Sequence, residues 1–120
     1  MKKILFYVFI LIVVLTVSGC GTTPSSSSRN PIITIVNNTG YDCLFLYVSP
    51  VTDEDWGDDV LGYDFLLNGD SYRVRLTQPL SIVDSYDIML VDVDDDTYTK
   101  WGVKLSNGSN IVFTQRDIDQ

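Results

Sequence analysis

The chain contains no histidine, and cysteine occurs only twice in its 120 residues, as Cys20 and Cys43. Histidine is the side chain that most often acts as general acid or base near neutral pH, and it is the commonest metal ligand. Cys43 lies in an apolar stretch, and no serine stands in the motif of a nucleophile elbow. We therefore expect no catalytic residues, no required cofactor and no enzymatic activity.

Basic residues are also scarce. Eight Lys and Arg face sixteen Asp and Glu, and the loss of Lys2 and Lys3 with the N-terminal segment described below would leave six basic residues. Clustered Lys and Arg bind phosphate backbones and anionic lipid headgroups. The composition therefore excludes nucleic acid as a partner.

Long apolar runs are missing, apart from one that is too short to span a bilayer. Residues 4–17 are almost all apolar, whereas a spanning helix needs about 20 such residues. The run follows the basic Met1–Lys3 and precedes small residues, an order typical of a cleaved signal peptide. We therefore assign residues 1–19 to a signal peptide.

The end of this run, Val17-Ser18-Gly19-Cys20, resembles the lipobox of bacterial lipoproteins, in which an aliphatic residue and two small residues precede the cysteine. The resemblance implies that Cys20 receives a diacylglyceryl group and that cleavage makes it the first residue. It implies a protein of the bacterial cell envelope, anchored by this lipid in the cytoplasmic or outer membrane, with its domain outside the cytoplasm. Cys43 would then have no partner for a disulfide.

Residues 20–30 contain the lipidated cysteine and a segment rich in Ser, Thr and Pro without apolar periodicity, which predicts a flexible, disordered tether. Residues 31–120 remain for a folded domain. A domain of about ninety residues buries enough surface to fold without disulfides or a structural metal.

The folded part has the pattern of an antiparallel β domain. Short runs rich in Val, Ile, Tyr and Phe alternate with Asn-Gly pairs and with Asp-rich or Pro-containing turns. Six strands in about 85 residues, mostly joined by tight turns, predict a small all-β fold, an antiparallel β-sandwich. The expected strands are 32–37, 43–49, 72–76, 86–92, 98–105 and 110–114.

Alternation within two of these strands predicts which side chains face the core. Both faces of strand 43–49 are apolar, which indicates a strand in the middle of a sheet. In strand 98–105, Trp101 alternates with Val103, and we expect both to face the core. Residues 117–119 should form a polar end of the chain.

Several separated stretches resemble a recurring small β domain of exported bacterial proteins. They are Ile33–Tyr41, Leu46–Pro50, Trp56–Gly62, Asn68-Gly69, Tyr86–Ile88 and Leu90–Asp92. The resemblance covers nearly all of residues 32–119 and implies the same domain limits and an all-β fold. No activity is established for that family, so the resemblance implies no substrate. The chain departs from the family pattern at Cys43, where an aliphatic or aromatic residue is usual, and this is consistent with a buried thiol.

An acidic loop surrounds Trp56. Calcium binds roughly six to eight oxygen atoms, and such a loop can supply several of them. The candidate calcium ligands here are Asp53, Asp55, Asp58 and Asp59. In the alternative interpretation, Thr52 and Asp55 form the capping box of a short helix whose first turn holds the acids.

A second acidic cluster has the spacing with which an EF-hand calcium loop begins. Its candidate ligands are Asp92, Asp94 and Asp96. The Gly and the bidentate Glu that an EF-hand requires are replaced by Thr97 and Val103, so this motif is excluded. Two interpretations stay open: an Asp-rich hairpin tip, or a calcium site of another type shared by the two clusters.

The aromatic residues indicate a binding surface. Trp56 lies in a loop and, with Asp58 and Asp59, is the candidate for contact with a partner; alternatively it plugs the end of the sandwich. Trp and Tyr faces also stack on sugars in carbohydrate-binding β-sandwiches. We expect a membrane-anchored, non-catalytic module that binds a protein or an envelope polymer. The alternatives are a calcium-dependent binding or adhesion module that uses residues 53–59 and 92–96, and a glycan-binding module.

Overall fold

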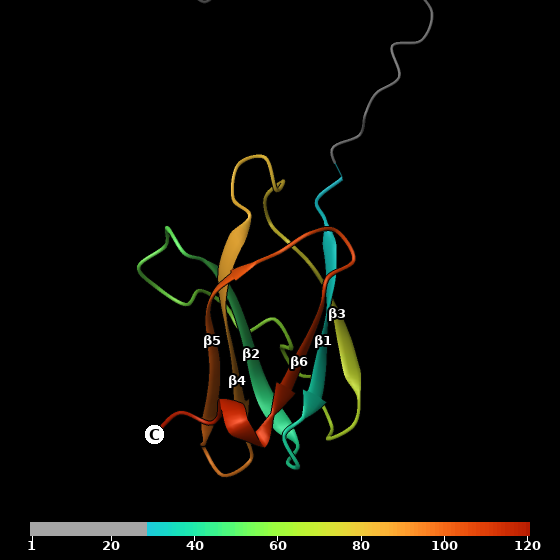
Figure 1. Cartoon of the computed structure of the whole chain (residues 1–120). Coiled ribbons are helices and arrows are strands. Elements are labelled where there is room, and N and C mark those ends of the chain that lie inside the picture. The colour runs from blue at the N-terminus through green and yellow to red at the C-terminus, as the bar shows by residue number, and fades with distance from the viewer. Residues whose placement is uncertain (1–28) are drawn as a thin grey trace, which may run out of the picture.

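Two three-stranded sheets lie face to face in the computed structural model, which describes residues 29–120 (Figure 1). The strands are β1 (Ile32–Asn38), β2 (Cys43–Pro50), β3 (Ser71–Arg75), β4 (Ser85–Asp92), β5 (Thr97–Lys104) and β6 (Asn110–Thr114), followed by the 3₁₀ helix η1 (Gln115–Asp117). The predicted all-β sandwich of six strands is therefore confirmed. The predicted signal peptide, Cys20 and the tether as far as Ser28 lie outside the described residues.

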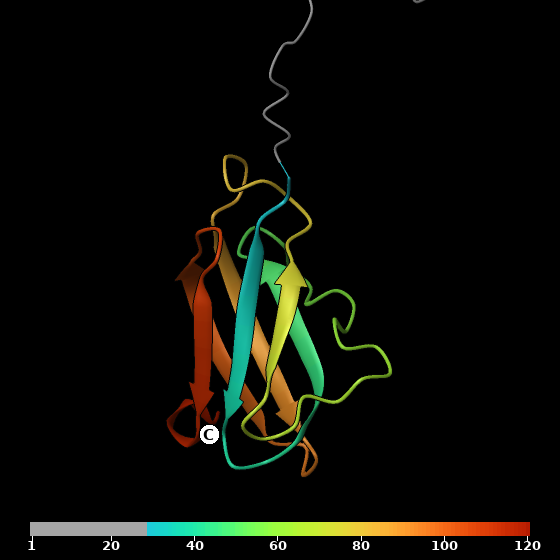
Figure 2. The same ribbon diagram turned by 90° about the vertical axis from the view of Figure 1, so that its right-hand side faces the viewer.

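The two sheets have the strand orders β3-β1-β6 and β2-β4-β5. Neighbouring strands are antiparallel except for β1 and β6, which run parallel. Figure 2 shows β3 stacked on the β2 side of the sandwich and β6 on the β5 side. Every predicted strand is present, with ends that differ from the prediction by at most one residue. In residues 29–120 no helix has the length and apolar character needed to cross a membrane.

The strand predicted to lie in the middle of a sheet, β2, is in fact at an edge, and β4 is central. The free edge of β2 is covered by the loop that follows it. Val60 N donates to Leu46 O at 2.7 Å, and Leu46 N donates to Asp59 Oδ1 at 2.9 Å. The loop thus satisfies backbone groups that an edge strand would leave unpaired. The prediction was wrong because the second apolar face of β2, with Phe45 and Tyr47, lies on the outer surface of the sheet rather than against another layer.

Alternate side chains of the strands meet between the two sheets. Ile33 and Ile35 of β1 and Ile88 and Leu90 of β4 are completely buried. Each apolar side chain of this size contributes about 1.5–3 kcal/mol when it is fully buried. The other buried hydrophobic residues are Cys43, Leu46, Leu61, Leu66, Val74, Leu76, Tyr86, Tyr98, Leu105 and Phe113. The free thiol is thus part of the core, as predicted.

A buried asparagine joins the β1–β2 turn to the segment before β3. Nδ2 of Asn37 donates to the backbone oxygens of Tyr41 at 2.7 Å and Leu66 at 2.9 Å. Its Oδ1 accepts from the N–H of Thr39 at 3.1 Å and from the Thr39 hydroxyl at 2.7 Å. All the hydrogen-bonding positions of the amide are therefore satisfied inside the core.

The C-terminal residues, which were predicted to form a polar end, fold back onto β5 and pair their acidic side chains there. Thr114 and Asp117 form a capping box at the start of η1. Asp117 also binds Lys100 Nζ at 3.0 Å, and Asp119 accepts a hydrogen bond from the Thr97 hydroxyl at 2.7 Å. These acidic side chains meet their partners on β5 only when the two sheets are stacked. The alternation of residues along one strand gives no information about such contacts.

Candidate functional site on the outer face of the β2-β4-β5 sheet

Four aromatic side chains form a row on the outer face of this sheet. Phe45 and Tyr47 project from β2, Trp56 comes from the loop after β2, and Trp101 projects from β5. The ring centroids are 6.4 Å apart from Phe45 to Tyr47, 6.4 Å from Tyr47 to Trp56 and 5.5 Å from Trp56 to Trp101. Aromatic rings in contact have separations of this size. We call this row the aromatic ridge.

The predicted position of Trp101 in the core is wrong, because a β-bulge interrupts the alternation of β5. Asp87 on β4 stands opposite two residues of β5, Trp101 and Gly102. Gly102 has a φ of +59°, and its N–H donates to Asp87 Oδ1 at 2.7 Å. The extra residue of a bulge re-aims the side chains around it. Trp101 consequently points outward and remains 69% exposed.

The loop of residues 51–59 is held against β2 at two points and presents Trp56 between them. Ser49, a buried residue, donates its hydroxyl to the backbone oxygen of Asp55 at 2.8 Å. Asp59 Oδ1 accepts from two backbone N–H groups at 2.9 and 3.0 Å. Trp56 is half-buried against the sheet face, between Tyr47 and Trp101. It therefore does not plug the end of the sandwich.

The short helix predicted to start at Thr52 is not formed. Residues 51–59 consist of turns and irregular backbone. Asp53 N donates to Pro50 O at 2.9 Å, which makes a tight turn at the end of β2. The capping box of Thr52 and Asp55 is therefore wrong, because Asp55 is instead held to Ser49 through its backbone oxygen.

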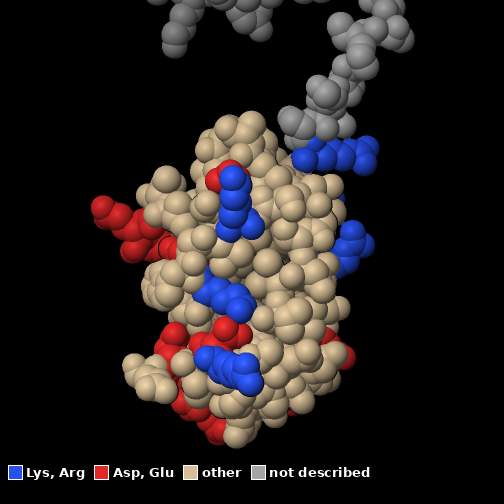
Figure 3. All heavy atoms as spheres, viewed as in Figure 1, with Lys and Arg blue, Asp and Glu red and all other residues tan. Residues whose placement is uncertain are grey.

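The structure separates the two acidic clusters that were considered as a shared calcium site. Pro50, where the 51–59 loop begins, pairs with Tyr86 at one end of β4, whereas Asp92 lies at the other end, opposite Cys43. In Figure 3 acidic side chains gather at the left margin and, separately, at the lower end. A site shared by the two clusters is therefore wrong. Within residues 29–120, no three Asp, Glu or Cys side chains are grouped so that they could hold a metal ion.

In the second cluster Asp92 stabilises the hairpin tip. Its Oδ1 accepts from the N–H of Asp94 at 2.8 Å and of Asp96 at 3.0 Å, and its Oδ2 accepts from the Tyr98 hydroxyl at 2.9 Å. Asp92 is completely buried, while Asp94 and Asp96 are exposed. These bonds agree with the Asp-rich hairpin interpretation. Of the first cluster, Asp53, Asp55 and Asp58 are exposed.

Trp56 and Trp101 also line a hollow of about 130 Å³ beside the ridge. Its other lining residues are Ser49, Asp53, Glu54, Asp55 and Asp87. Carboxylates accept hydrogen bonds from hydroxyl and ammonium groups, while the indole rings offer apolar faces. Asp58 and Asp59, predicted with Trp56 as binding residues, line a neighbouring hollow of about 270 Å³ together with that tryptophan.

Sequence reasoning considered the Trp and Tyr side chains as a sugar-stacking surface, but it favoured only Trp56 as a contact residue and did not include Phe45. The alternation of Phe45 and Tyr47 was noticed, but it was interpreted as the second apolar face of a central strand. Trp101 was assigned to the core. The signal that was available is a pair of aromatic residues on one face of a strand, followed within ten residues by a loop tryptophan.

The buried thiol and the buried phenol are unsuited to nucleophilic chemistry. Desolvation by burial raises the pKa of Cys43 from 9.0 to about 11. Burial, followed by the hydrogen bond to Asp92, also raises the pKa of Tyr98. The thiolate is the reactive form of cysteine, and at neutral pH this environment keeps Cys43 protonated.

No protein-family model matches the chain, and no curated protein sequence is significantly similar to it. The fold is similar to a solved structure described as the NMR structure of a protein from Eubacterium rectale. The similarity covers 82% of this chain and 90% of that chain, with a TM-score of 0.57 and a sequence identity of 14%. At this identity the similarity supports the fold alone.

Proposed function

We propose that the protein is a lipid-anchored, non-enzymatic binding module of the bacterial cell envelope, and that its aromatic ridge stacks on the sugar units of an envelope polysaccharide. The observation that carries this proposal is the unbroken row of four rings on one sheet face. The lipobox at Cys20 and the Ser-rich tether support attachment to a membrane.

Exposed rings in contact with one another are unusual on the surface of a small domain. Trp101 is 69% exposed and Phe45 38% exposed, so much of their apolar surface remains in water. A contiguous exposed apolar patch commonly marks a binding surface. The C–H face of a pyranose ring is apolar and packs on an aromatic ring, while its hydroxyl groups stay free to donate to nearby carboxylates.

The acidic surroundings narrow the class of polysaccharide. Four carboxylates and no basic side chain line the hollow next to Trp56 and Trp101. An anionic polymer would be repelled there, whereas hydroxyl and ammonium groups would find acceptors. We therefore expect a neutral glycan or one that carries amino groups.

The position of the ridge is compatible with a tether at the N-terminus. β1 begins at one end of the sandwich, whereas the β2-β4-β5 sheet faces sideways (Figure 1). A chain held at its N-terminal end would thus leave the ridge accessible to polymer alongside the membrane.

The test is a titration of the full-length protein, dissolved in a detergent without a sugar headgroup, with three oligosaccharides. The probes are chitotetraose, which is neutral, its de-acetylated form, which is cationic, and tetragalacturonate, which is anionic. Tryptophan fluorescence should change saturably with one or both of the first two and not with the third. Trp101→Ala should weaken this binding at least about tenfold, because it removes the most exposed ring of the ridge and a wall of the acidic hollow.

Tyr63→Ala is the matched control, because Tyr63 is a fully exposed aromatic residue outside the ridge. It should bind the oligosaccharides as the wild type does. The glycan proposal is wrong if neither chitotetraose nor its de-acetylated form binds at millimolar concentration, or if Trp101→Ala binds as tightly as Tyr63→Ala.

A further inference from the structure

β3 has one free edge, which lies on the open side of the sandwich next to β2. Its only neighbour among residues 29–120 is β1. The N–H of Thr34 and the carbonyl of Ile32 form hydrogen bonds of 2.8 Å with the segment that leads into β6. Their register partners on β3, Arg73 and Arg75, therefore direct their own N–H and C=O groups away from β1. The edge of β2 is paired with its loop at Leu46, whereas this edge of β3 has no paired strand at Arg73 and Arg75.

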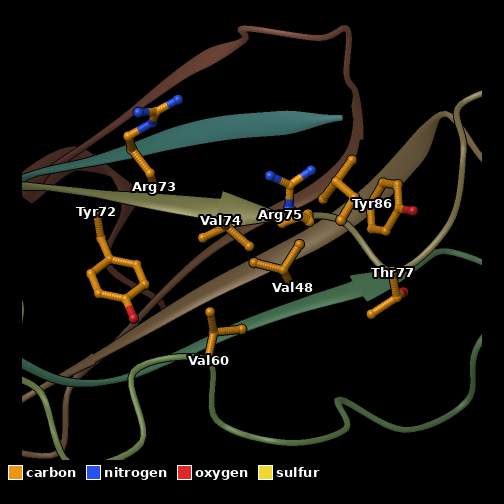
Figure 4. Close-up of a pocket in the computed structure, with 9 residues that line it drawn as sticks. Val48, Val60, Tyr72, Arg73, Val74, Arg75, Thr77 and Tyr86 are labelled. Atoms are coloured by element: carbon orange, nitrogen blue, oxygen red, sulfur yellow. The ribbon is translucent and has the colours of Figure 1, made fainter. Parts of the chain in front are cut away.

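An apolar cavity of about 240 Å³ opens between this free edge and β2. Figure 4 shows Val48, Val60 and Val74 pointing toward one another in the gap. Tyr86 lines the same cavity and is 1% exposed, yet its hydroxyl has no hydrogen-bond partner, alone among the buried side-chain polar atoms of residues 29–120. In Figure 4 this hydroxyl points away from the three valines, so the part of the cavity that they line is apolar.

Two arginines border the cavity on the outer face of β3. In Figure 4 the guanidinium groups of Arg73 and Arg75 lie on the side of β3 away from Val48 and Val60. Neither arginine forms a salt bridge with a described carboxylate, although the chain has twice as many acidic as basic residues. In Figure 3 basic side chains stand at the upper part of the right margin and a small acidic patch lies lower on it, while most acidic side chains gather to the left and below. At Arg73 and Arg75 the edge is therefore basic, although the protein as a whole is acidic.

We propose that the free edge of β3 takes up an extended segment of another protein in which acidic and apolar residues alternate. Added as a strand, the segment would pair its backbone with the free N–H and C=O groups of Arg73 and Arg75. Side chains of a strand alternate between its two faces. The acidic ones would therefore lie beside the two arginines, and the apolar ones would enter the cavity between Val48, Val60 and Val74.

A second copy of this chain fits the edge less well. If two β3 edges paired, the arginines of one copy would lie opposite those of the other, and opposed like charges destabilise a strand pair. The site is also separate from the aromatic ridge, which lies on the outer face of the other sheet. Binding at β3 therefore does not depend on glycan binding.

The test uses the full-length protein in detergent and fluorescently labelled octapeptides. An alternating Glu-Val peptide should bind saturably by fluorescence anisotropy. An alternating Lys-Val peptide should bind at least about tenfold more weakly, because it places like charges together. Glu-Val peptides that are N-methylated at every second residue, in both registers, should lose binding in the register that faces β3, because N-methylation removes the donors of the ladder.

Two variants of Arg73 distinguish the contribution of its backbone N–H to peptide binding from the contribution of its charge. Arg73→Ala removes the charge but keeps the N–H on the free edge, and it should weaken Glu-Val binding several-fold. Arg73→Pro removes the N–H as well and should abolish binding. It leaves the β1–β3 hydrogen bonds in place, because this N–H points away from β1. Arg116→Ala, on η1, is the control and should bind as the wild type.

Strand addition is overturned if Arg73→Pro binds the Glu-Val peptide as tightly as Arg73→Ala, or if N-methylation has no effect in either register. The charge assignment is overturned if the Lys-Val peptide binds equally well. A dimer of the free protein in analytical ultracentrifugation that Arg73→Pro dissociates would identify a second copy as the occupant and overturn the proposal. If Arg73→Pro melts early, the N-methylated peptides test the same hydrogen bonds on the wild-type protein.

Discussion

Replacing Cys43 by alanine should remove part of the loss of stability that we expect at alkaline pH. The thiol is completely buried, and burial raises its pKa from 9.0 to about 11. The folded state therefore keeps this proton in a pH range where the unfolded chain releases it. The stabilisation is fully present below pH 9 and is lost as the pH rises from 9 through 11.

The size of the effect follows from the two pKa values. Each pH unit over which only the unfolded chain has lost the proton lowers the free energy of unfolding by about 1.4 kcal/mol. The pKa is 9.0 in the unfolded chain and about 11 in the folded protein, so between these pH values the thiol lowers the free energy of unfolding by about 3 kcal/mol in total. This is a substantial part of the roughly 5–15 kcal/mol that stabilises a typical domain.

The assay is urea unfolding of a fragment of residues 29–120, which contains both sheets, at pH values between about 7.5 and 11. Cys43→Ala should be less stable than the wild type at pH 7.5, because it loses packing in the core. The difference in free energy of unfolding between Cys43→Ala and the wild type should decrease as the pH rises. Tyr98, whose pKa is also raised, titrates in both proteins and cancels in the difference. A constant difference between the two proteins across this range would refute the reasoning from burial.

Asn37→Ala should lower the free energy of unfolding by about 3 kcal/mol, because it leaves buried donors and acceptors without partners; an unchanged urea midpoint would contradict this. Gly102→Val should cost about 1–3 kcal/mol through strain at a positive φ, whereas Gly102→Asn should be tolerated, and equal melting temperatures of the two variants would rule out the strain. Cys20→Ser should abolish incorporation of labelled palmitate in a bacterial host, and persistent labelling would disprove the lipobox assignment. Millimolar calcium should leave the melting temperature unchanged, and a rise of several degrees that magnesium does not produce would restore the calcium-dependent module.

Strand positions were predictable because their signals are local. Tyr72 and Val74 alternate with arginines, which marks β3, and the Asn68-Gly69 pair places the turn before it, with Gly69 at a φ of +90°. Each of these signals spans only a few residues, so no knowledge of the neighbouring strand was needed. The burial of Cys43 followed in the same way from the apolar run around it.

The orientation of Trp101 was not predictable from its own strand. It depends on the bulge, and the bulge depends on Asp87, which stands on β4 and accepts a hydrogen bond from Gly102 N. The edge position of β2 depends in the same way on Asp59 and Val60, which return from the loop to cover it. Both features require contacts between residues that lie more than ten positions apart.

The sequence by itself determined the six strands, the buried thiol and the hairpin turn between β4 and β5, because periodicity and turn chemistry act within a few residues. The tertiary structure decided which strands are neighbours. It therefore also decided which residues come together in each candidate site. It assembled the aromatic ridge from β2, a loop and β5, left the edge of β3 free, and placed the two acidic clusters at opposite ends of β4. The physical reason is that these arrangements are selected by packing between distant segments, and no single segment records that choice.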